Sequence, residues 1–527
     1  MTKMMKHKIL SIMGAGLLLL TLGACREQSD TLVSYGRQDQ LSFGEAETSY
    51  AGKFKVLWNG LNQHYALWDY ERDHGLDWDA VYDKYLPQFE ALDQQKEVTD
   101  DQLKKLATEV ISPLHDGHLV VQLKNHKTGK FVAISPSGER NLQRPDFKDA
   151  YLNPPSLQYY LNKEHGEVEL DEQGKPITME YSTEISDLLD VFREGEDVGL
   201  EWITDSISAL KKLTTPTAEQ VDMLQTLTEL KKQVDMIKDT KEGVMLYNAL
   251  ANRYAFLNIP AFDPIDEHFA DYGVKVRFAL LKGNIAYIHF DGFSLSYYLD
   301  EETRTESFPN PDKSTQEKIG KVQTVWNSWF SYIQQLHKSG QLGGVIIDVR
   351  NNGGGSVGDY PYVMGALLPS GGFEIGKARF KHGTGRLDYS PLMPQIVNTL
   401  ETEHATITEP IVVLANCHSV SMAEITSISA KYIDNATLIG KRTWGGMCAL
   451  SGNDNFSINY TGHIGEEDKT PVYVYLPMLA QFDREGHILE GVGVTPDIEI
   501  DLDIKQFKAT GKDTQLDCAL QHIRNRK

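Results

Sequence analysis

Ser421 has the sequence context of a catalytic nucleophile. It follows an apolar run at 411–414 and a short polar turn, and it opens a segment, 421–433, whose pattern predicts a helix. A serine hydroxyl projects from such a helix start, while the N–H of Met422 has no partner within the helix and can stabilise an oxyanion. A structural interpretation stays open, because Ser421-x-x-Glu424 is also the pattern of a capping box, in which the serine satisfies a backbone donor.

A second candidate element is a buried apolar strand that runs into the triple-glycine turn 353–355. Glycine has no Cβ, so the N–H groups of such a turn can approach a ligand closely, and in an α/β sheet the turn lies at the carboxyl edge, where ligands bind. Gly353 or Gly354 could therefore supply a second oxyanion donor, with Asp348 and Arg350 bracing the loop by pairing. Two other interpretations stay open. One is a nucleotide-binding loop, although the Lys-Ser/Thr pair of a P-loop is missing, and the other is a plain flexible turn.

Histidine suits a serine nucleophile as general base, since its ordinary pKa of about 6.5 lies close to neutral pH. His115 and His118 occur together in the segment Leu114-His-Asp-Gly-His118. Their spacing could also begin a metal site, but no third or fourth ligand follows at a usual spacing, so we predict neither a metal centre nor an organic cofactor. His115 and His418 are expected to be bystanders.

Five features in a fixed order resemble the tail-specific (C-terminal processing) and tricorn-core serine peptidases, over 45–120 and 275–503. They are Trp78-Asp-Ala-Val-Tyr-Asp-Lys-Tyr85 with Leu114-His-Asp-Gly-His118, then Asp348-Val-Arg-Asn-Asn-Gly-Gly-Gly355, Ser419-Val-Ser-Met-Ala-Glu424, Gly440-Lys-Arg-Thr-Trp-Gly-Gly446 and Glu490-Gly-Val-Gly-Val-Thr-Pro-Asp497. The resemblance implies a serine peptidase with Ser421 as its nucleophile.

The identity of the catalytic base divides this family. The tail-specific branch uses a lysine in the glycine turn after the strand that follows the nucleophile helix, whereas this chain has Gly445-Gly446-Met447 there, and Lys441 lies before the turn. The segment 443–446 resembles the tricorn-type branch, in which a histidine of the helical domain is the base and a glutamate near the end of the core orients it. By position, the resemblance implies that these residues are His118 and Glu490.

Residues 1–25 have the pattern of an export signal. Three lysines precede an apolar run at 9–22, which ends in Leu22-Gly-Ala-Cys25 and is shorter than the roughly 20 residues that cross a bilayer core. Small residues before a lone cysteine resemble a bacterial lipobox, which implies that Cys25 carries lipid; an ordinary cleaved signal is the alternative. We therefore expect a lipid-anchored protein of the bacterial cell envelope, periplasmic or surface-exposed, with a polar tether at 26–44.

Composition narrows the range of partners. The chain has 527 residues, too many for one hydrophobic core, and a formal net charge of −22. Such a charge repels phosphate backbones and anionic headgroups, so we expect no nucleic-acid partner and only a local membrane anchor. Cys417, Cys448 and Cys518 show neither CxxC nor metal-ligand spacing and are expected to be core residues.

Apolar periodicity predicts the domain organisation. Helical spacing predicts a small helical domain at 45–118, and 119–273 is expected to be a mixed insertion with a helical segment near 198–256, in which we recognise no PDZ domain. From 274 to 503, short apolar runs alternate with helical patterns, which predicts an α/β peptidase core of βαβ units. A C-terminal tail at 504–527 follows.

Together these features predict a serine-type endopeptidase that hydrolyses a polypeptide substrate through an acyl-enzyme on Ser421, with His118 as general base. The rival hypothesis is a peptide- or lipid-binding lipoprotein that keeps the fold without turnover, as the retinoid-binding relatives of this family suggest. Retention of Ser421, His118, Gly354 and Glu490 argues against a pure binder. A third hypothesis, a metallohydrolase, would be revealed by sensitivity to chelators.

Overall fold

The chain divides into two compact units, each assembled from segments that are far apart in the sequence. Unit 1 comprises Met1–Ser137, Gly376–Pro394 and Cys448–Glu490, and unit 2 comprises Gly138–Ile375, Gln395–Met447 and Gly491–Lys527. The computed structural model describes residues 43–141, 143–147, 276–290, 292–381, 385–448, 463–477, 479–503 and 512–526, with further positions at 207–208, 210–213, 221, 224–225, 228, 231, 383 and 506.

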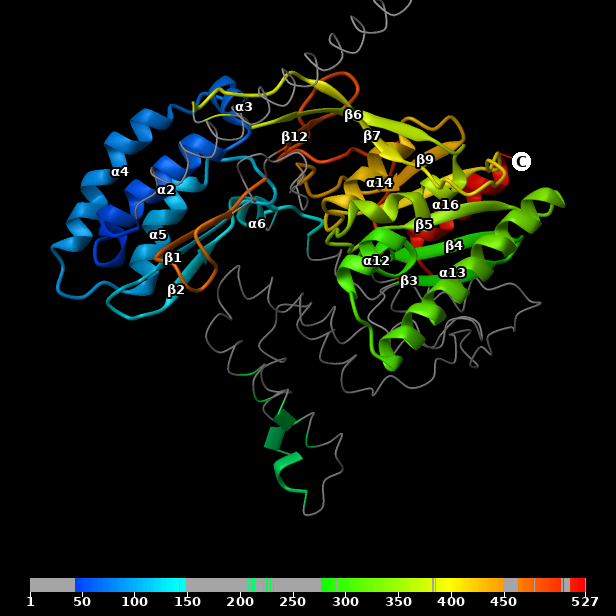
Figure 1. Ribbon diagram of the computed structural model, residues 1–527, viewed down its shortest axis with the longest axis horizontal. Coiled ribbons are helices and arrows are strands. Elements are labelled where there is room, and N and C mark those ends of the chain that lie inside the picture. Colours follow the sequence, from blue (N-terminus) through cyan, green and yellow to red (C-terminus); the bar gives the residue numbers. More distant parts are fainter. Residues whose placement is uncertain are drawn as a thin grey trace, which may run out of the picture. The chain divides into compact units, whose positions relative to one another are not determined.

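The helices of unit 1 are η1 (Glu45–Glu47), α2 (Tyr50–His64), α3 (Trp68–Asp73), α4 (Trp78–Asp93) and α5 (Asp100–Ile111), of which α2 to α5 are labelled in Figure 1. Side chains cap the starts of α2, α4 and α5. The side chains of Ser49, Asp77 and Thr99 accept hydrogen bonds from first-turn N–H groups of α2, α4 and α5. These bonds satisfy donors that a helix start leaves unpaired. The helical region predicted from periodicity is therefore present.

Strands from distant parts of the chain complete unit 1. A four-stranded sheet has the order β10-β11-β1-β2, with both neighbours of β1 antiparallel to it. The strands are β1 (Val120–Lys124), β2 (Phe131–Ile134), β10 (His463–Ile464) and β11 (Val472–Tyr475). Their inward side chains join the same apolar core as the helices. The helices at 45–118 thus belong to a mixed unit that also takes strands from the segment expected to be peptidase core.

A six-stranded sheet with the order β13-β9-β8-β5-β4-β3 forms the centre of unit 2. Its strands are β3 (Val276–Leu281), β4 (Ile285–Phe290), β5 (Gly344–Asp348), β8 (Ile411–Ala415), β9 (Ala436–Gly440) and β13 (Ile498–Glu499). β3 is antiparallel to β4, and all other neighbours are parallel. Every residue of β4, β5 and β8 is buried, as expected for parallel strands with both faces covered. The predicted α/β core is confirmed.

Two helices labelled in Figure 1 cover opposite faces of this sheet. α16 (Thr514–Asn525) packs with Ile346 of β5, whereas α13 (Lys313–Lys338) lines an apolar pocket together with Val345 and Ile347 of the same strand. Because successive residues of a strand point to opposite faces, α13 and α16 lie on opposite sides of the sheet. The segment expected to be a C-terminal tail therefore contributes a core helix.

The structure also contains a third sheet and several shorter elements. A three-stranded sheet has the order β12-β6-β7, and residues 377–380 of β6 pair antiparallel with β12. The remaining elements are α6 (Pro136–Asn141), α11 (Ser296–Leu299), α12 (Glu301–Ser307), η6 (Val357–Tyr362), η7 (Gly365–Leu367), β6 (Gly372–Phe380), β7 (Met393–Asn398), α14 (Met422–Ala430) and β12 (Leu479–Phe482).

Several sequence predictions concern residues that the structure does not describe. The export signal at 1–25, the lipid site Cys25 and most of the helical stretch near 198–256 lie outside the described residues. Among the helices that are described, none has both the length and the apolar character needed to cross a membrane. The lipid anchor therefore stays a prediction.

A buried ion-pair network ties the end of β5 to the start of α16. The guanidinium of Arg350 donates to both carboxylate oxygens of Asp348 (2.6 to 3.1 Å), to Asp513 (2.8 Å) and to Gln515 (2.9 Å). Burial alone would raise the pKa of Asp348, but the adjacent Arg350 and His289 hold that pKa well below its usual range. The pairing of Asp348 with Arg350 that the sequence predicted is confirmed.

Arg350→Ala is expected to lower the free energy of unfolding by about 3–5 kcal/mol, because it leaves the buried carboxylates of Asp348 and Asp513 without their cation. Urea denaturation followed by circular dichroism measures the change. Lys441→Ala is the control, since Lys441 pairs with the exposed carboxylates of Glu499 and Asp501 and its loss should cost about 0–1 kcal/mol. Equal costs for the two variants would contradict a stabilising role for the buried network.

Candidate active site

Three loops meet at the carboxyl edge of the unit 2 sheet, because they follow β5, β8 and β9, which are parallel neighbours. The loops span 349–355, 416–421 and 441–446. Backbone hydrogen bonds join them: the N–H of Val420 donates to the carbonyl of Asn352 (2.9 Å), and the N–H of Ser421 donates to the carbonyl of Gly446 (3.1 Å). The serine loop therefore lies between the triple-glycine loop and the loop that follows β9.

Ser421 has a backbone conformation that an ordinary helix cap does not need. It is the N-cap of α14 and forms a capping box with Glu424, yet its φ is 57° and its ψ is −116°. By contrast, the N-cap Ser49 of α2 is extended, with φ −128° and ψ 134°. A non-glycine residue in such a sparsely populated region costs on the order of 1–3 kcal/mol, and this kind of strain is concentrated at functional sites. Capping therefore accounts for the position of Ser421 but not for its conformation.

Glu424 organises this loop from a fully buried position. Its carboxylate accepts hydrogen bonds from the hydroxyl of Thr443 (2.6 Å) and from the N–H groups of Gly445 (2.8 Å), Gly446 (2.6 Å) and Ser421 (3.3 Å). Burial raises the pKa of Glu424, and these hydrogen bonds oppose the increase. One carboxylate thus joins Ser421 to the loop that follows β9.

The three predicted oxyanion donors differ in what their N–H groups contact. Among the described residues, the N–H groups of Met422 and Gly353 donate no hydrogen bond. The N–H of Gly354 instead donates to Oδ1 of Asn352 (2.7 Å). Gly354 has a φ of 96°, and a Cβ at this position would lie 2.7 Å from the Cβ of Ser421. Gly354 therefore packs closely against Ser421, and of the three predicted donors only the N–H groups of Met422 and Gly353 have no acceptor among the described residues.

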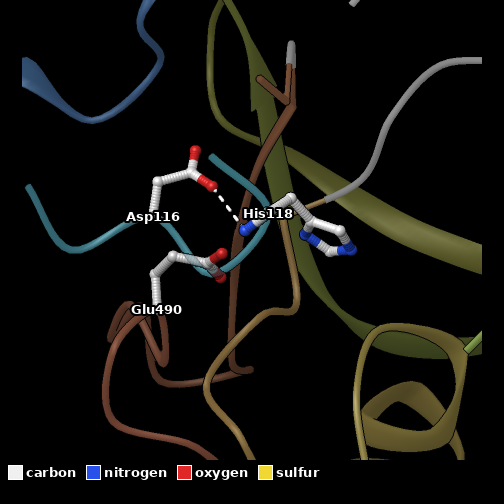
Figure 2. A group of neighbouring side chains, drawn as sticks. All are labelled: Asp116, His118 and Glu490. Carbon is white, nitrogen blue, oxygen red and sulfur yellow. Dashed lines mark hydrogen bonds between the residues drawn. The ribbon is translucent and has the colours of Figure 1, made fainter. Parts of the chain in front are cut away.

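In unit 1, two buried carboxylates hold the turn that carries His118. Oδ1 of Asp116 accepts the N–H of His118 (2.8 Å) and the N–H of the following residue (2.9 Å). Glu490 accepts the N–H of Gly117 at Oε1 and the N–H of Cys448 at Oε2, both at 2.9 Å. Figure 2 shows Asp116, His118 and Glu490 side by side. Glu490, far from His118 in the sequence, is thus hydrogen-bonded to the turn that carries His118.

The imidazole of His118 is neutral at neutral pH, because burial lowers its pKa to about 4. Its Nδ1 is enclosed and has no hydrogen-bond partner among the described residues. One ligand atom from each of Asp116, His118 and Glu490 lies within 4.8 Å of the others. Figure 2 shows the imidazole pointing away from both carboxylates, which bind backbone N–H groups of the turn and of Cys448. Within the described part of the chain, Asp116, His118 and Glu490 are also the group whose atoms could hold a metal ion.

His115, the other histidine of the segment, contacts Glu71 instead. Its backbone N–H and its Nδ1 each lie 2.7 Å from a carboxylate oxygen of Glu71, which also accepts the hydroxyl of Tyr65 (2.6 Å). The N–H of Asp116 donates in turn to the hydroxyl of Tyr65 (3.3 Å). These bonds brace the start of the turn that carries His118.

Two further side chains considered from the sequence have other partners. Lys441 pairs with Glu499 (2.7 Å) and Asp501 (2.8 Å). Nε2 of His418 lies 3.2 Å from the carbonyl of Phe147, and burial lowers the pKa of His418 to about 3. These contacts give both residues structural roles.

Two carboxylates, Asp116 and Glu424, have structural roles that were not predicted from the sequence. Asp116 bonds the N–H two residues later, which is the Asx turn expected of the Asp116-Gly-His118 pattern, so that pattern could have indicated it. Glu424 was treated only as a capping partner, and no sequence signal indicates its bonds to Gly445 and Gly446.

Two segments of the chain match known protein families, and the turn that carries His118 lies outside both of them. Residues 284–500 match the family model Peptidase family S41, and residues 46–101 match the Tricorn protease C1 domain. The chain therefore carries a peptidase family S41 domain and a tricorn C1 segment. The resemblance predicted over 275–503 and 45–120 is confirmed at the level of the family for residues 284–500 and 46–101.

Curated relatives match a limited part of the chain. It is 27% identical over 192 residues to the tricorn protease of Thermoplasma volcanium, which covers 36% of this chain and 16% of the relative. It is 28% identical over 180 residues to the tricorn protease of Thermoplasma acidophilum, which covers 34% of this chain and 14% of the relative. The chain thus spans less than a fifth of the length of either tricorn protease.

Solved structures show weaker similarity. A protein of Parabacteroides merdae described as a candidate peptidase is 15% identical, with a TM-score of 0.45, and the match covers 90% of this chain and 96% of that chain. Mature CPAF is 13% identical, with a TM-score of 0.46, and the match covers 91% of this chain and 98% of that chain.

Proposed function

From its peptidase family S41 domain, we propose that this chain is a serine peptidase that hydrolyses polypeptides. Ser421 is the nucleophile, His118 is the general base, and Glu490 is the third member of the triad. The carboxylate of Glu490 holds the backbone of Gly117, next to His118. The observation that carries the proposal is the strained backbone of Ser421, held between Glu424 and Gly354. Such strain is expected where a side chain must be presented for chemistry rather than for capping.

The proposed reaction follows the acyl-enzyme route. The hydroxyl of Ser421 attacks the carbonyl carbon of the scissile peptide bond while its proton passes to His118. The N–H groups of Met422 and Gly353 stabilise the oxyanion. His118 then gives the proton to the leaving amine, and water hydrolyses the ester on Ser421. The reaction needs neither a metal nor an organic cofactor.

His118 and Glu490 belong to unit 1, and Ser421 belongs to unit 2. The choice of histidine over lysine is supported by the turn Gly445-Gly446-Met447, which lacks a lysine, and by the pairing of Lys441 with Glu499 and Asp501.

Reaction with a fluorophosphonate probe tests the proposal directly, since such probes form a covalent adduct with activated serine hydroxyls. We expect a single adduct, located on Ser421 by peptide mass spectrometry. A folded protein that forms no adduct, or an adduct on Ser419 alone, would show that Ser421 is not the nucleophile.

We propose further that the protein is anchored by lipid on Cys25 at the bacterial cell envelope. The apolar run that ends in Leu-Gly-Ala-Cys25 supports this. In detergent phase separation, the wild type is expected in the detergent phase and Cys25→Ala in the aqueous phase, because the variant lacks the acyl chains. Cys518→Ala removes another cysteine and should partition like the wild type. Recovery of a soluble protein that still begins at Met1 would contradict the proposal.

A further inference from the structure

The guanidinium of Arg144 has an acceptor for each of its five N–H donors, all within unit 2. Nε donates to Oδ1 of Asp146 (3.1 Å), and Nη2 donates to Oδ2 of the same carboxylate (2.9 Å). Nη1 donates to the carbonyl of Thr443 (2.7 Å) and to Oδ1 of Asn141 (3.3 Å), and Nη2 also donates to the carbonyl of Arg442 (2.5 Å). The side chain of Arg144 is only 10% exposed. This use of every donor is specific to a planar guanidinium fork.

The two carbonyls that Arg144 binds belong to the loop that holds Ser421. From the same loop, the hydroxyl of Thr443 and the N–H of Gly446 donate to Glu424, which accepts the N–H of Ser421. The N–H of Ser421 also donates to the carbonyl of Gly446 (3.1 Å). A continuous path of hydrogen bonds therefore runs from Arg144 through Thr443 and Glu424 to Ser421.

The segment around Arg144 has anchors that do not depend on the guanidinium. The ring of Phe147 lies 4.4 Å from the ring of His418 and 6.3 Å from that of Trp444, measured between centroids. The amide of Asn141 donates to the carbonyl of Trp444 (3.3 Å). Loss of the Arg144 side chain should therefore leave the segment in place and release only the carbonyls of the loop.

We infer that Arg144 is a positioning residue for the nucleophile, acting through the loop 442–446 and Glu424 on Ser421. The inference rests on the proposed function of Ser421. Arg144 holds the carbonyls of the loop, whereas Glu424 accepts the hydroxyl of Thr443 and the N–H of Gly446 from the same loop. The guanidinium therefore helps to set where Glu424 holds the N–H of Ser421. A displacement of about 1 Å at a reacting group can cost on the order of 10²-fold in rate. The effect should fall on bond formation and not on affinity.

Inactivation by a fluorophosphonate probe separates these two quantities. Its concentration dependence yields the maximal rate constant, kinact, and the half-saturating concentration, KI. Arg144→Ala is expected to lower kinact by about 10- to 100-fold, with KI within about twofold of wild type. Arg144→Lys should recover only a small part of the loss, because an ammonium has three donors and no fork. Lys441→Ala, which removes a nearby basic side chain, should leave both constants unchanged.

A second variant tests the inference in case Arg144→Ala does not fold. Asp146→Asn keeps Arg144 but weakens its bidentate partner, so we expect a smaller loss of kinact at constant KI. The inference is overturned if a cooperatively melting Arg144→Ala reacts like wild type. If that variant does not fold, wild-type kinact in both Arg144→Lys and Asp146→Asn overturns it. If the wild type does not react with the probe, both the proposed function and the inference fail. If the wild type reacts and the variants react equally fast, only the inference fails.

Discussion

Ser421→Ala is expected to abolish peptide hydrolysis, with a loss on the order of 10⁶ in kcat, and to abolish labelling by a fluorophosphonate. The substitution removes the atom that forms the acyl bond and leaves the N–H groups of Met422 and Gly353 in place. Alanine keeps the same strained backbone, and the N–H of Glu424 still donates to the main-chain carbonyl of residue 421 (2.8 Å in the wild type). The loss of the cap hydroxyl should cost about 1 kcal/mol at most. Initial rates and thermal melts, measured on the same samples, test both expectations.

Ser421→Gly separates the strain from the chemistry. Glycine adopts positive φ without a Cβ clash, so this variant should be as inactive as Ser421→Ala but more stable than it by about 1 kcal/mol. If Ser421→Gly proved less stable than the alanine variant, the φ of 57° at Ser421 would not be a source of strain.

Ser419→Ala is the matched control two residues earlier. Ser419 is buried, its hydroxyl donates to the carbonyl of Val349 (2.7 Å), and it accepts the N–H of Asn416 (3.0 Å). Its removal leaves buried polar groups unsatisfied and should cost about 1–3 kcal/mol of stability, while labelling continues. If Ser419→Ala were inactive and Ser421→Ala active, the wrong serine would have been chosen.

His118→Ala is expected to lower kcat by a factor on the order of 10⁶, because a serine hydroxyl without a base is a poor nucleophile. Lys441→Ala should retain most activity, since Lys441 pairs with Glu499 and Asp501. A well-folded His118→Ala with full activity, combined with an inactive Lys441→Ala, would reverse the assignment of the base.

The pH profile gives an independent measure of the same base. A general base works in its neutral form, and burial lowers the pKa of His118 to about 4, so the neutral form persists well below the ordinary histidine pKa. We therefore expect kcat/KM to stay level from neutral pH to about pH 5 and to fall tenfold per pH unit below about pH 4. Circular dichroism at each pH must show the folded protein. A decline that begins near pH 6.5 would indicate a base with an unperturbed imidazole.

The local elements of this protein follow directly from its sequence. The apolar runs at 345–347 and 411–414 lie within β5 and β8, and the helical patterns predicted between the strands of 274–503 include α13 (Lys313–Lys338). These predictions succeed because buried parallel strands and amphipathic helices leave short-range periodicities in the chain. The parallel arrangement also follows from strands that alternate with helices, and it places the loops of Ser421 and Gly354 at one edge.

The sequence could not determine which groups, far apart along the chain, hydrogen-bond to one another after folding. Glu424 looks like a cap residue, yet Gly445 and Gly446 donate to its carboxylate from a loop that follows another strand. Glu490 lies 372 positions after His118 in the sequence. Its carboxylate accepts the N–H of Gly117, 373 positions before it, in the turn that carries His118. Sequence periodicity reports only neighbours along the chain, whereas a hydrogen bond depends on the distance between atoms.

The division into units is the clearest case of this kind. Periodicity indicates a helical domain at 45–118, because α2, α4 and α5 carry their own apolar faces. Those faces are covered in part by β11, whose short apolar run gives no sign of which segment it will pair with. A strand is completed by hydrogen bonds to another strand, and its side-chain alternation specifies a face but not a partner. The sequence therefore determined the helices and strands and the kind of side chain at Ser421 and His118. The tertiary structure decided which groups hold these two residues in place.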